Sequence, residues 1–583
     1  MYEFLKTINS PQDIKKLSIT ELKELASEAR EAILFRLSCK GGHFGPNLGI
    51  VEATIALHYV FNSPVDKFVF DVSHQSYCHK LLTGRANAFI DEKELDMASG
   101  YTNPDESEHD VFNVGHTSTS VSLACGLAKA RDLKQTKENI VAIIGDGSLS
   151  GGEALEGIDF ASELNSNLII VVNDNDMSIA ENHGGLYANL KSLRDSKGQC
   201  ECNLFKAFNL DYLYVDDGND IEALIQAFSK VKDTTRPVVV HINTVKGKGY
   251  CQAEVEKEKY HFFGPFDRKT GEPKYPASES YISVARDFIV KKIESDPLFV
   301  AICAGAPSSI GFDSELRAKA GKQFVDVGIA EEHAVAFASA IAANGAKSLF
   351  GTYSSFIQRT YDQMSQDLCL NNSPAAILVS NASVFGMRDK THLGIFDIPL
   401  LSSIPNLVYL APASREELIS MLDWAVEQKN HPVAIKMPGG PVCSADYPVS
   451  TDFSDINKYQ VTKSGRGVAI LALGCFYQIG VDLCNDLKKK GVNATLINPR
   501  FITGVDSELL DSLKESHHTV VTIEDGVLDG GFGQKIASYY GSCDMKVYSY
   551  GLKREFIDRY NVLDVLESNR LTSEQIIKDI EKA

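Results

Sequence analysis

Two polar residues, Asp146 and Asn175, have types and a spacing that could hold a metal ion beside phosphates. Asp146 follows the apolar run VAIIG that starts at Val141, and Asn175 lies just past the run LIIVVN that starts at Leu168. The segment between them has helical periodicity, which predicts a strand–helix–strand unit with parallel strands. Both residues then lie at the carboxyl edge of a sheet, where open α/β sheets bind ligands. Hard oxygen ligands of this kind suit Mg²⁺ shared with a ligand's phosphates.

The glycines around Asp146 support a phosphate site. Gly145 and Gly147 let the backbone approach a diphosphate, and the next helix offers free amides and the positive end of its dipole. A Gly-Asp-Gly tripeptide alone is more often a plain turn, but its pairing with Asn175 across one unit is much more specific. The apolar face of the intervening helix is predicted at Ala154, Leu155, Ile158, Ala161 and Leu164.

The elements that position these residues follow a repeated rhythm of apolar strand, loop and amphipathic helix, which is typical of parallel α/β layers. Several strands lack polar alternation, so helices should cover both faces of each sheet. Two segments rich in charge, Gly and Pro, 251–280 and 437–460, read as connectors. They divide the chain into three α/β domains, which we place at 1–277 (with the linker from about 251), 278–440 and 457–583. Strands are predicted at VAIIG (from Val141), LIIVVN (Leu168), PVVVHIN (Pro237), AAILVS (Ala375), GVAILALG (Gly467) and HTVVTIED (His518).

Composition narrows the class of protein. The chain has 583 residues and a net charge of −19, which argues against a nucleic-acid binder. It contains no apolar run long enough to span a bilayer, and its start lacks the apolar core of a signal peptide. Twelve cysteines without a zinc-like cluster are expected to be reduced thiols, mostly small buried hydrophobic residues, in a cytoplasmic protein.

Longer segments carry a family resemblance. The spacing from GDG to the asparagine pair resembles the thiamine diphosphate motif of transketolase-type enzymes, and NDNDMSIAEN looks more specifically like the 1-deoxy-D-xylulose-5-phosphate synthase family. The resemblance keeps the family's order from about residue 40 to near the end of the chain. It is also carried by GGHFGPNLGIVEATIALHYVFN, FDVSHQSYCHKLLTGR, ESEHDVFNVGHTSTSVS, VDVGIAEEHAVAFA and YSSFIQRTYDQ.

The resemblance implies that the first domain holds the diphosphate end of the cofactor. Mg²⁺ would be held by Asp146, Asn175 and the carbonyl of Met177. Cofactor contacts would come from His74, Gly115, His116, Thr117, Gly147, Ser148, Asn175 and Tyr250. Each histidine taken alone is more often a hydrogen-bonded structural residue.

The second domain, by the same resemblance, serves the aminopyrimidine ring. Glu331, at the start of a predicted helix with Ala334, Phe337, Ala338 and Ile341 on its apolar face, would hydrogen-bond the ring and promote the tautomer that acts as base. A carboxylate at a helix start is otherwise explained by the helix dipole. The remaining active-site residues would be His43, His261, Tyr353, Phe356 (a cofactor contact), Arg359 and His392.

The sequence departs from the family where the substrate's phosphate is expected. Asn381 and Gly439 stand at two positions of phosphate-binding arginines, and Arg388 replaces an aspartate. Neither Asn381 nor Gly439 can make a forked contact. Nearby cations, Arg388, Lys390 and Lys436, would rebuild a phosphate site, bind a carboxylate, or simply be solvated. A second departure is a deletion after Gly198, in a segment that covers the site in the family, which would leave this site more open.

The resemblance implies a homodimeric transferase of isoprenoid biosynthesis, dependent on thiamine diphosphate and magnesium. It would decarboxylate pyruvate and join the remaining two-carbon unit to glyceraldehyde 3-phosphate. One alternative is a transketolase-like carboligase with another donor or acceptor, favoured by Asn381 and Gly439. A degenerate regulatory paralogue is the other, and retention of Asp146, Asn175 and Glu331 argues against it. No nucleic acid or membrane partner is expected.

Overall fold

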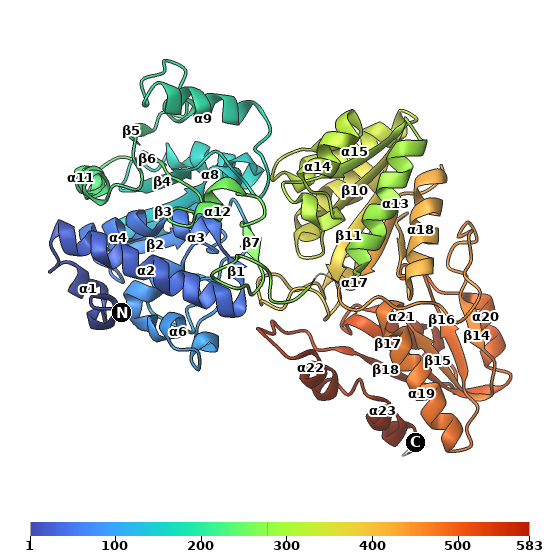
Figure 1. Ribbon diagram of the computed structural model, residues 1–583. Coiled ribbons are helices and arrows are strands. Elements are labelled where there is room, and N and C mark those ends of the chain that lie inside the picture. The colour runs from blue at the N-terminus through green and yellow to red at the C-terminus, as the bar shows by residue number, and fades with distance from the viewer. Residues whose placement is uncertain (1, 277, 582–583) are drawn as a thin grey trace. The chain divides into compact units, whose positions relative to one another are not determined.

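The computed structural model describes residues 2–276 and 278–581. The chain folds into two compact units, each described by itself. The first comprises Met1–Ala277 with Gly328–Ala330, and the second comprises Ser278–Val327 with Glu331–Ala583. Parallel sheets covered by helices form both units, which confirms the predicted fold class (Figure 1).

The first unit is built on a five-stranded parallel sheet in the order β2-β3-β4-β6-β5. Helices α7, α8 and α9 pack on one face and α4 and α11 on the other, so the strands are apolar on both sides, as predicted. The strands are β2 (Lys67–Phe70), β3 (Ile140–Gly145), β4 (Ile169–Asp174), β5 (Asp211–Val215) and β6 (Val238–Asn243). The main helices are α2 (Ile19–Lys40), α4 (Val51–Val60), α7 (Ser120–Lys134), α8 (Gly152–Ala161), α9 (Gly185–Asp195) and α11 (Ile221–Val231).

Shorter elements complete the first unit. The predicted connector from 251 to 280 contains a strand, β7 (Phe262–Phe263), which pairs antiparallel with β1 (Gly42–His43). This pairing brings a late segment of the unit beside an early one. The other short helices are η1 (Leu5–Thr7), α1 (Pro11–Ile14), α3 (Gly45–Gly49), α5 (Tyr77–Lys80), η2 (Leu81–Arg85), α6 (Asn87–Ile90), η3 (Leu95–Met97), η4 (Gly147–Ser150), α10 (Leu204–Ala207) and α12 (Cys251–Val255).

Helix α8 is shorter than its apolar pattern suggested. Ala154, Ile158 and Ala161 are buried as predicted, but the helix ends at Ala161. Leu164 lies beyond that end and is only half-buried, because the chain turns there toward β4. The predicted strand–helix–strand unit is otherwise confirmed.

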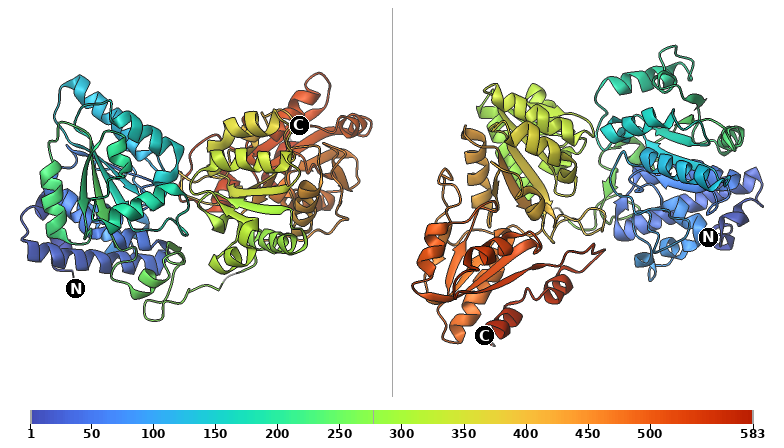
Figure 2. Two further views of the ribbon diagram at one scale, coloured as in Figure 1. Left: turned by 90° about the horizontal axis from the view of Figure 1, so that it is seen from above. Right: turned by 180° about the vertical axis from the view of Figure 1, so that it is seen from behind.

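The second unit contains two sheets (Figure 2). The larger is parallel, in the order β12-β13-β11-β10-β8-β9, with α13 and α18 on one face and α15 on the other. The smaller, β14-β16-β15-β17-β18, is parallel except for β14 and shares part of its core with the larger. The strands are β8 (Phe299–Cys303), β9 (Phe324–Asp326), β10 (Lys347–Tyr353), β11 (Ala376–Ala382), β12 (Val408–Leu410), β13 (Val433–Pro438), β14 (Gln460–Lys463), β15 (Gly467–Ala472), β16 (Thr495–Asn498), β17 (His517–Val527) and β18 (Lys546–Leu552).

The second unit also contains the helices that pack on or connect its two sheets. They are α13 (Tyr281–Ser295), η5 (Pro307–Ile310), α14 (Ser314–Ala320), η6 (Gly321–Gln323), α15 (Glu331–Ala343), η7 (Phe356–Thr360), α16 (Tyr361–Gln363), η8 (Met364–Cys369), α17 (Asp397–Leu401), α18 (Arg415–Glu427), η9 (Gly474–Phe476), α19 (Tyr477–Lys489), α20 (Ser507–Leu513), α21 (Phe532–Tyr540), α22 (Val562–Ser568) and α23 (Ser573–Glu581). All twelve cysteines are free thiols. Within the described ranges, no helix has the length and apolar character needed to cross a bilayer.

Candidate active site

Three neighbouring strands of the first unit end in polar residues at one edge of its sheet. Asp71 directly follows β2, Asp146 directly follows β3, and Asn175 directly follows β4. In the parallel register Gly145 lies opposite Asn173, so the ends of β3 and β4 are level. The sequence analysis predicted Asp146 and Asn175 at this edge. It missed Asp71, although the same signal, a polar residue after an apolar run, precedes the loop that carries His74.

Asp146 is a buried carboxylate with 2% of its surface exposed. Its Oδ2 accepts hydrogen bonds from the Met177 backbone N–H at 3.0 Å and from Asn182 Nδ2 at 2.9 Å. Burial, and next the Asp174 carboxylate, raise the pKa of Asp146. In the described part of the chain, the buried Oδ1 of Asn175 has no hydrogen-bond partner.

These atoms fit a hard divalent cation. A buried carboxylate and an amide oxygen without a donor are both costly to leave without a partner, and both are oxygen ligands of the kind Mg²⁺ prefers. The described residues contain no group of three or more His, Cys, Asp or Glu side chains placed to hold a metal. A cation here would therefore complete its coordination with backbone oxygens, water and a ligand's phosphates.

The backbone beside Asp146 is tightly packed. A Cβ on Gly147 would lie 2.8 Å from Ser178 Oγ, and one on Gly151 would lie 2.1 Å from Ser118 Oγ. Ser118 Oγ in turn donates to the Ser148 carbonyl at 2.8 Å. A side chain at Gly147 or Gly151 would displace these serines, so glycine at both positions is explained by the packing of the turn, whereas a Cβ on Gly145 would meet nothing within 4 Å.

The loop with Gly115, His116 and Thr117 leads into α7 and is fixed at its end. The backbone N–H groups of Ser118 and Ser120 donate to the two oxygens of Asp71, at 2.8 and 3.0 Å. Through Ser118 this loop also meets Ser148. The predicted cofactor contacts of the first unit are thus brought to one sheet edge, with the exception of Tyr250.

Tyr250 has the surroundings of a core residue. Its ring packs against Phe44 and Tyr260, with centroids 5.1 and 5.9 Å away, and joins the apolar cluster under α2. The buried hydroxyl of Tyr250 has no hydrogen-bond partner among the described residues, so its role as a cofactor contact stays a prediction.

Three predicted histidines form a cluster. The ring of His43 lies 4.8 Å from that of His74 and 5.6 Å from that of His261, and the His74 and His261 rings are 5.6 Å apart. His43 ends β1 and His261 immediately precedes β7, so the β1–β7 pairing brings these two together. Asn47 Nδ2 donates to the carbonyls of both His43 and His74. Burial lowers the pKa values of His43 and His261 well below the ordinary range, so both rings are neutral at pH 7.

Lys246 lies near this cluster and was missed. Its side chain is buried, and its Nζ donates to the Ser178 carbonyl at 2.5 Å. Burial lowers the pKa of Lys246 to about 7, and its charge acts on both His43 and Asp146. The motif KGKGY contained the signal, but the sequence analysis selected Tyr250 from it.

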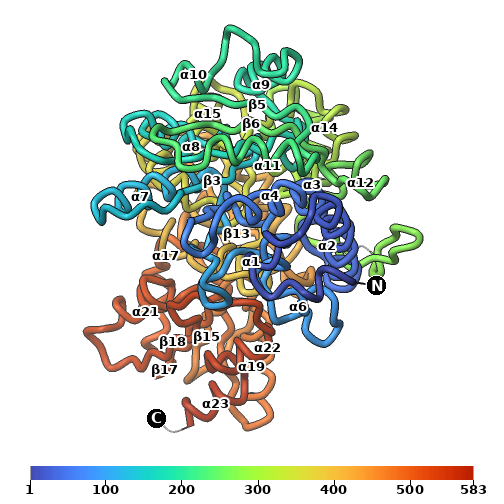
Figure 3. Tube along the Cα trace, turned by 90° about the vertical axis from the view of Figure 1, so that its left-hand side faces the viewer, coloured from blue at the N-terminus to red at the C-terminus, as the bar shows by residue number. Residues whose placement is uncertain are grey.

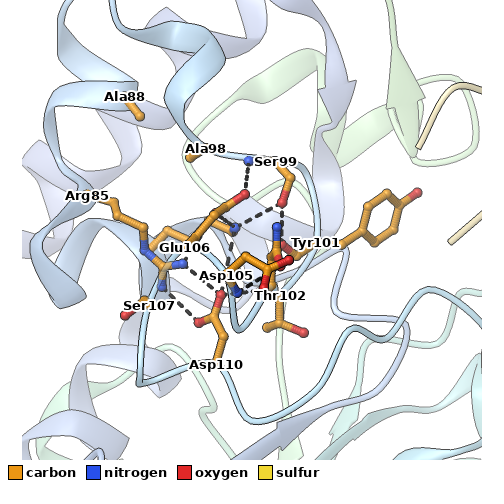
Figure 4. A network of polar contacts seen from close by, with 12 residues as sticks. Arg85, Ala88, Ala98, Ser99, Tyr101, Thr102, Asp105, Glu106, Ser107 and Asp110 are labelled. Carbon is orange, nitrogen blue, oxygen red and sulfur yellow. Dashed lines mark hydrogen bonds and ion pairs between the residues drawn. The ribbon is translucent and has the colours of Figure 1, made fainter. Parts of the chain in front are cut away.

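A network of buried charges holds a further residue, Tyr101, against the histidine cluster. Lys80 Nζ contacts Glu106 at 2.5 Å, and Glu106 accepts the Ser99 N–H at 2.8 Å. Ser99 Oγ donates to the Tyr101 carbonyl, and the Tyr101 ring lies 5.8 Å from that of His43. Figure 4 shows Tyr101 pointing away from the charged groups.

Arg85 fixes the other end of the same loop. It forms a two-pronged ion pair with Asp110, at 2.7 and 2.9 Å, and Asp110 also accepts the Asn103 N–H at 2.8 Å (Figure 4). The loop from Ser99 to Asp110 is therefore rigidly supported from α5 and η2. No sequence pattern predicted this network of buried charges.

The second unit gathers its predicted residues at the carboxyl end of β10. Glu331 begins α15 and is 3% exposed. Its Oε2 has no hydrogen-bond partner among the described residues, and Arg359 Nη1 lies 3.9 Å away. Burial raises the pKa of Glu331 to about 7, against the opposite effect of Arg359.

Aromatic rings connect the other members of this group. The Phe356 ring lies 6.0 Å from Tyr353 and 5.6 Å from His392. The Tyr353 hydroxyl lies 3.0 Å from Ser308 Oγ. The five predicted residues of this unit therefore form two contact groups, Glu331 with Arg359 and Phe356 with Tyr353 and His392, and η7 carries a member of each.

The expected phosphate positions are occupied by backbone. A Cβ on Gly439 would lie 2.7 Å from Gly386 Cα and 2.8 Å from the Phe385 carbonyl oxygen. Asn381 has φ +51°, and its carbonyl would lie 2.0 Å from a Cβ on Gly386. The turn after β11 thus fills the space beside the end of β13.

Lys436 does not rebuild a phosphate site, which corrects one option left by the sequence. Its Nζ lies 2.8 Å from both oxygens of Asp397 and 3.9 Å from Asp525, and 1% of the residue is exposed. Two buried carboxylates already neutralise this lysine. Arg388, in contrast, is exposed, while the Lys390 N–H donates to Asp558.

Comparison with known protein families finds a match in each of the three predicted domains. The family model for 1-deoxy-D-xylulose-5-phosphate synthase matches residues 5–201 and 196–244. The transketolase pyrimidine-binding domain matches 280–442, and the transketolase C-terminal domain matches 457–576. The first match breaks at 196–201, where the sequence analysis placed a deletion.

Individual relatives extend over the full length. The 1-deoxy-D-xylulose-5-phosphate synthase of Alkaliphilus oremlandii is 38% identical over 624 residues, covering 100% of this chain and 99% of the relative. That of Clostridium acetobutylicum is 37% identical over 626 residues, with coverage of 100% and 99%. A crystal structure of transketolase from Campylobacter jejuni covers 97% of this chain and 100% of that chain at 17% identity, with a TM-score of 0.45.

Proposed function

The chain belongs to the 1-deoxy-D-xylulose-5-phosphate synthase family, and from this premise we propose that it is a thiamine-diphosphate-dependent transferase that joins a two-carbon unit from pyruvate to glyceraldehyde 3-phosphate. This reaction places it in isoprenoid biosynthesis. The observation that carries the proposal, beyond full-length similarity, is the convergence of Asp146 and Asn175 at one sheet edge. Nothing in the similarity supports the alternative carboligase over the family's reaction.

The proposed cofactor site has a metal end in the first unit. Asp146, the Asn175 amide oxygen and the Met177 carbonyl hold Mg²⁺, and Gly147, Ser148 and the loop from Gly115 to Thr117 approach the diphosphate. The bound cofactor supplies a carbon acid whose anion attacks a carbonyl and accepts electrons on decarboxylation. The buried Oδ1 of Asn175, which has no hydrogen-bond partner among the described residues, supports this assignment.

Glu331 acts on the aminopyrimidine end. Its pKa near 7 lets the carboxyl group share a proton with a ring nitrogen in either direction. Arg359, 3.9 Å away, limits how far that pKa rises. Tyr353, Phe356 and His392 then line the same region of the second unit.

The histidine cluster handles protons on the substrate. Neutral His43 and His261 can each donate and accept a hydrogen bond without placing a charge near the cationic cofactor. Lys246, with a pKa lowered to about 7, supplies an adjacent proton donor or a positive charge for the diphosphate. Tyr101 packs on His43 and limits its movement.

We further propose that the chain has three domains with the boundaries given above, that it forms a homodimer, and that it is located in the cytoplasm. The match of the second and third domains to transketolase domains supports the division. The twelve free thiols support a reducing compartment.

The test is a reconstitution with purified protein. Thiamine diphosphate, MgCl₂, pyruvate and glyceraldehyde 3-phosphate should yield CO₂ and 1-deoxy-D-xylulose 5-phosphate, and EDTA should abolish both. Glu331→Gln serves as the negative control. Failure to release CO₂ from pyruvate with any of a panel of aldehydes would overturn the proposal.

A further inference from the structure

Helix α9 is fastened to the loop that carries Asn175. Arg194, near the end of α9, donates from Nη1 to both oxygens of Asp174, each at 2.7 Å. Its Nη2 lies 2.6 Å from Asp176 Oδ1. Asp174 and Asp176 are the two residues that flank Asn175, so one guanidinium holds both sides of that residue.

Asp174 also has a polar contact with the neighbouring strand β6. It is fully buried, and His241 Nε2 on β6 lies 2.8 Å from its Oδ2. The Tyr212 hydroxyl on β5 lies 2.8 Å from His241 Nδ1. The Arg194 contact therefore ends a chain of polar contacts that crosses three adjacent strands of the sheet. The two arms of the guanidinium fork contact different carboxylates, Nη1 that of Asp174 and Nη2 that of Asp176, so Arg194 fixes the position of both residues as well as balancing their charge.

The start of the same segment touches the other metal-binding turn. Asn182 Nδ2 donates to Asp146 Oδ2 at 2.9 Å, and the Tyr187 hydroxyl on α9 donates to the Gly147 carbonyl at 3.1 Å. Residues 182–194 thus contact both the Gly-Asp-Gly turn and the Asn-Asp-Asn loop.

The outer side of α9 is anchored as well. Asn189 Nδ2 donates to the Cys202 carbonyl at 2.8 Å, and its Oδ1 accepts the Leu204 N–H at 3.1 Å. The short segment after α9 is therefore tied back onto the helix. Figure 3 shows α9 and α10 near β5 at the end of the first unit opposite α2, and Figure 1 shows α9 at the same end. The more open site expected from the deletion stays a prediction.

We propose that α9 is a fixed clasp on the metal-binding loops, and that Arg194 is the positioning residue that keeps Asn175 in ligand geometry. The inference rests on the proposed magnesium–cofactor site. It assigns α9 to cofactor retention and leaves the chemistry to other residues. Loss of the clasp should weaken Mg²⁺ binding while leaving turnover intact once Mg²⁺ is saturating.

The experiment compares Arg194→Met, Arg194→Lys and Tyr187→Phe with the full-length wild type. Calorimetric titration with MgCl₂ in the presence of thiamine diphosphate gives the Mg²⁺ affinity, and hydrogen exchange reports the order of residues 174–195. Removing the Arg194 fork is expected to weaken Mg²⁺ binding by roughly 10–100-fold, the range for residues that orient metal ligands. Arg194→Lys, which keeps the charge without the fork, should recover part of the loss.

Two further variants make the result decisive. Arg194→Met leaves a buried carboxylate uncompensated and can unfold the region, whereas Asp174→Asn combined with Arg194→Met leaves no such charge. The double variant is expected to fold, to exchange faster along α9 and to bind Mg²⁺ more weakly. Lys191→Met, which breaks an exposed pair with Asp195 on the same helix, is the matched control and should change nothing.

Three results would overturn the inference. The first is a folded double variant with wild-type Mg²⁺ affinity. The second is a turnover loss in Arg194→Lys that saturating MgCl₂ does not restore, because the residue would then act on the chemistry. The third is a wild type that binds no Mg²⁺ at all, which defeats the proposed function itself and takes this inference with it.

Discussion

The carboxyl edges of two parallel sheets in this protein are filled in different ways. At the edge of the first unit, Asp146 is a buried carboxylate, and the buried Oδ1 of Asn175 has no hydrogen-bond partner among the described residues. In the β11–β13 part of the second unit's larger sheet, the turn after β11 packs its backbone against Gly439, and Lys436 is already neutralised by Asp397. The first edge therefore keeps an oxygen for a ligand, whereas the β11–β13 part of the second edge is filled by the chain's own backbone and by an internal ion pair.

This difference distinguishes the metal and diphosphate site, which the family shares, from the acceptor's phosphate site, where this chain departs from the family. Ligands bind at carboxyl edges because loops there can supply polar groups without disturbing the sheet. A metal and a diphosphate need the same donors in every member of a family, whereas an acceptor can be recognised in several ways. The predictions below test each edge in turn, from the largest expected effect to the smallest.

Substituting Asp146 or Asn175 by Ala should abolish magnesium-dependent cofactor binding, because each change removes one of the two side-chain oxygen ligands. The fold should remain, since neither residue supports the core. Calorimetry with MgCl₂ and thiamine diphosphate measures the loss, with Asp159→Ala on the exposed face of α8 as the control. Unchanged cofactor affinity in both variants would place the metal elsewhere and end the contrast between the two edges.

Glu331→Gln should keep most cofactor affinity and lose turnover by roughly 10²–10⁴-fold, the usual size of a general acid–base contribution. The amide cannot exchange a proton with the ring, but it still fits the buried position. Steady-state kinetics at saturating cofactor, paired with a binding titration, separates the two effects. Near-normal turnover would show that another carboxylate, such as the adjacent Glu332, exchanges the proton with the ring.

Glu331 should also make the cofactor-free protein less stable as pH rises. Its pKa is raised from the ordinary 4.5 to about 7, so the folded state holds a proton that the unfolded state releases. Stability is therefore lost between about pH 4.5 and pH 7, by up to about 3 kcal/mol. Thermal unfolding across this range should show a wild type that weakens relative to Glu331→Gln. Parallel pH profiles for the two proteins would contradict the burial assigned to this carboxyl.

Local sequence patterns predicted which polar residues lie at the carboxyl edge of the first unit's sheet. A polar residue after an apolar run marks the end of a buried strand, and two such ends in one strand–helix–strand unit must be adjacent. Asp146 and Asn175 needed no more than that. The meeting of His43 with His261 required the β1–β7 pairing, which joins segments more than 200 residues apart and which periodicity cannot reveal.

The second edge could not be predicted in this way. Lys436 appeared in the sequence as a cation available to a substrate, because its partners Asp397 and Asp525 come from distant segments. The space around Gly439 depends on the path of the turn from Asn381 to Gly386. Lys246 and the network of Lys80 and Arg85 were missed for the same reason, since burial of a charge is decided by tertiary contacts.

Gly439→Ala should destabilise the protein by about 1–3 kcal/mol, the usual effect of overpacking. The added Cβ would lie within 3 Å of backbone atoms of Phe385 and Gly386, which cannot rotate away. Denaturant unfolding measures the change, with Gly126→Ala as the control because its Cβ would meet nothing within 4 Å. A neutral Gly439→Ala would mean that the turn yields easily, and Gly439→Arg could then restore a forked donor.

The smallest effect is expected at Arg388, and it decides how this chain treats the acceptor's phosphate. Two charge-assisted donors, each worth about 1.5–3 kcal/mol when fully used, are absent at Asn381 and Gly439. Arg388 is exposed, and exposed ion pairs contribute about 0.2–1 kcal/mol. Arg388→Ala should therefore raise KM for glyceraldehyde 3-phosphate by no more than about fivefold and leave glyceraldehyde unchanged. Kinetics on this matched pair, in wild type and variant, gives the phosphate's contribution directly. An effect of a hundredfold or more would show that Arg388 is ordered on the phosphate, and that the second edge was rebuilt rather than closed.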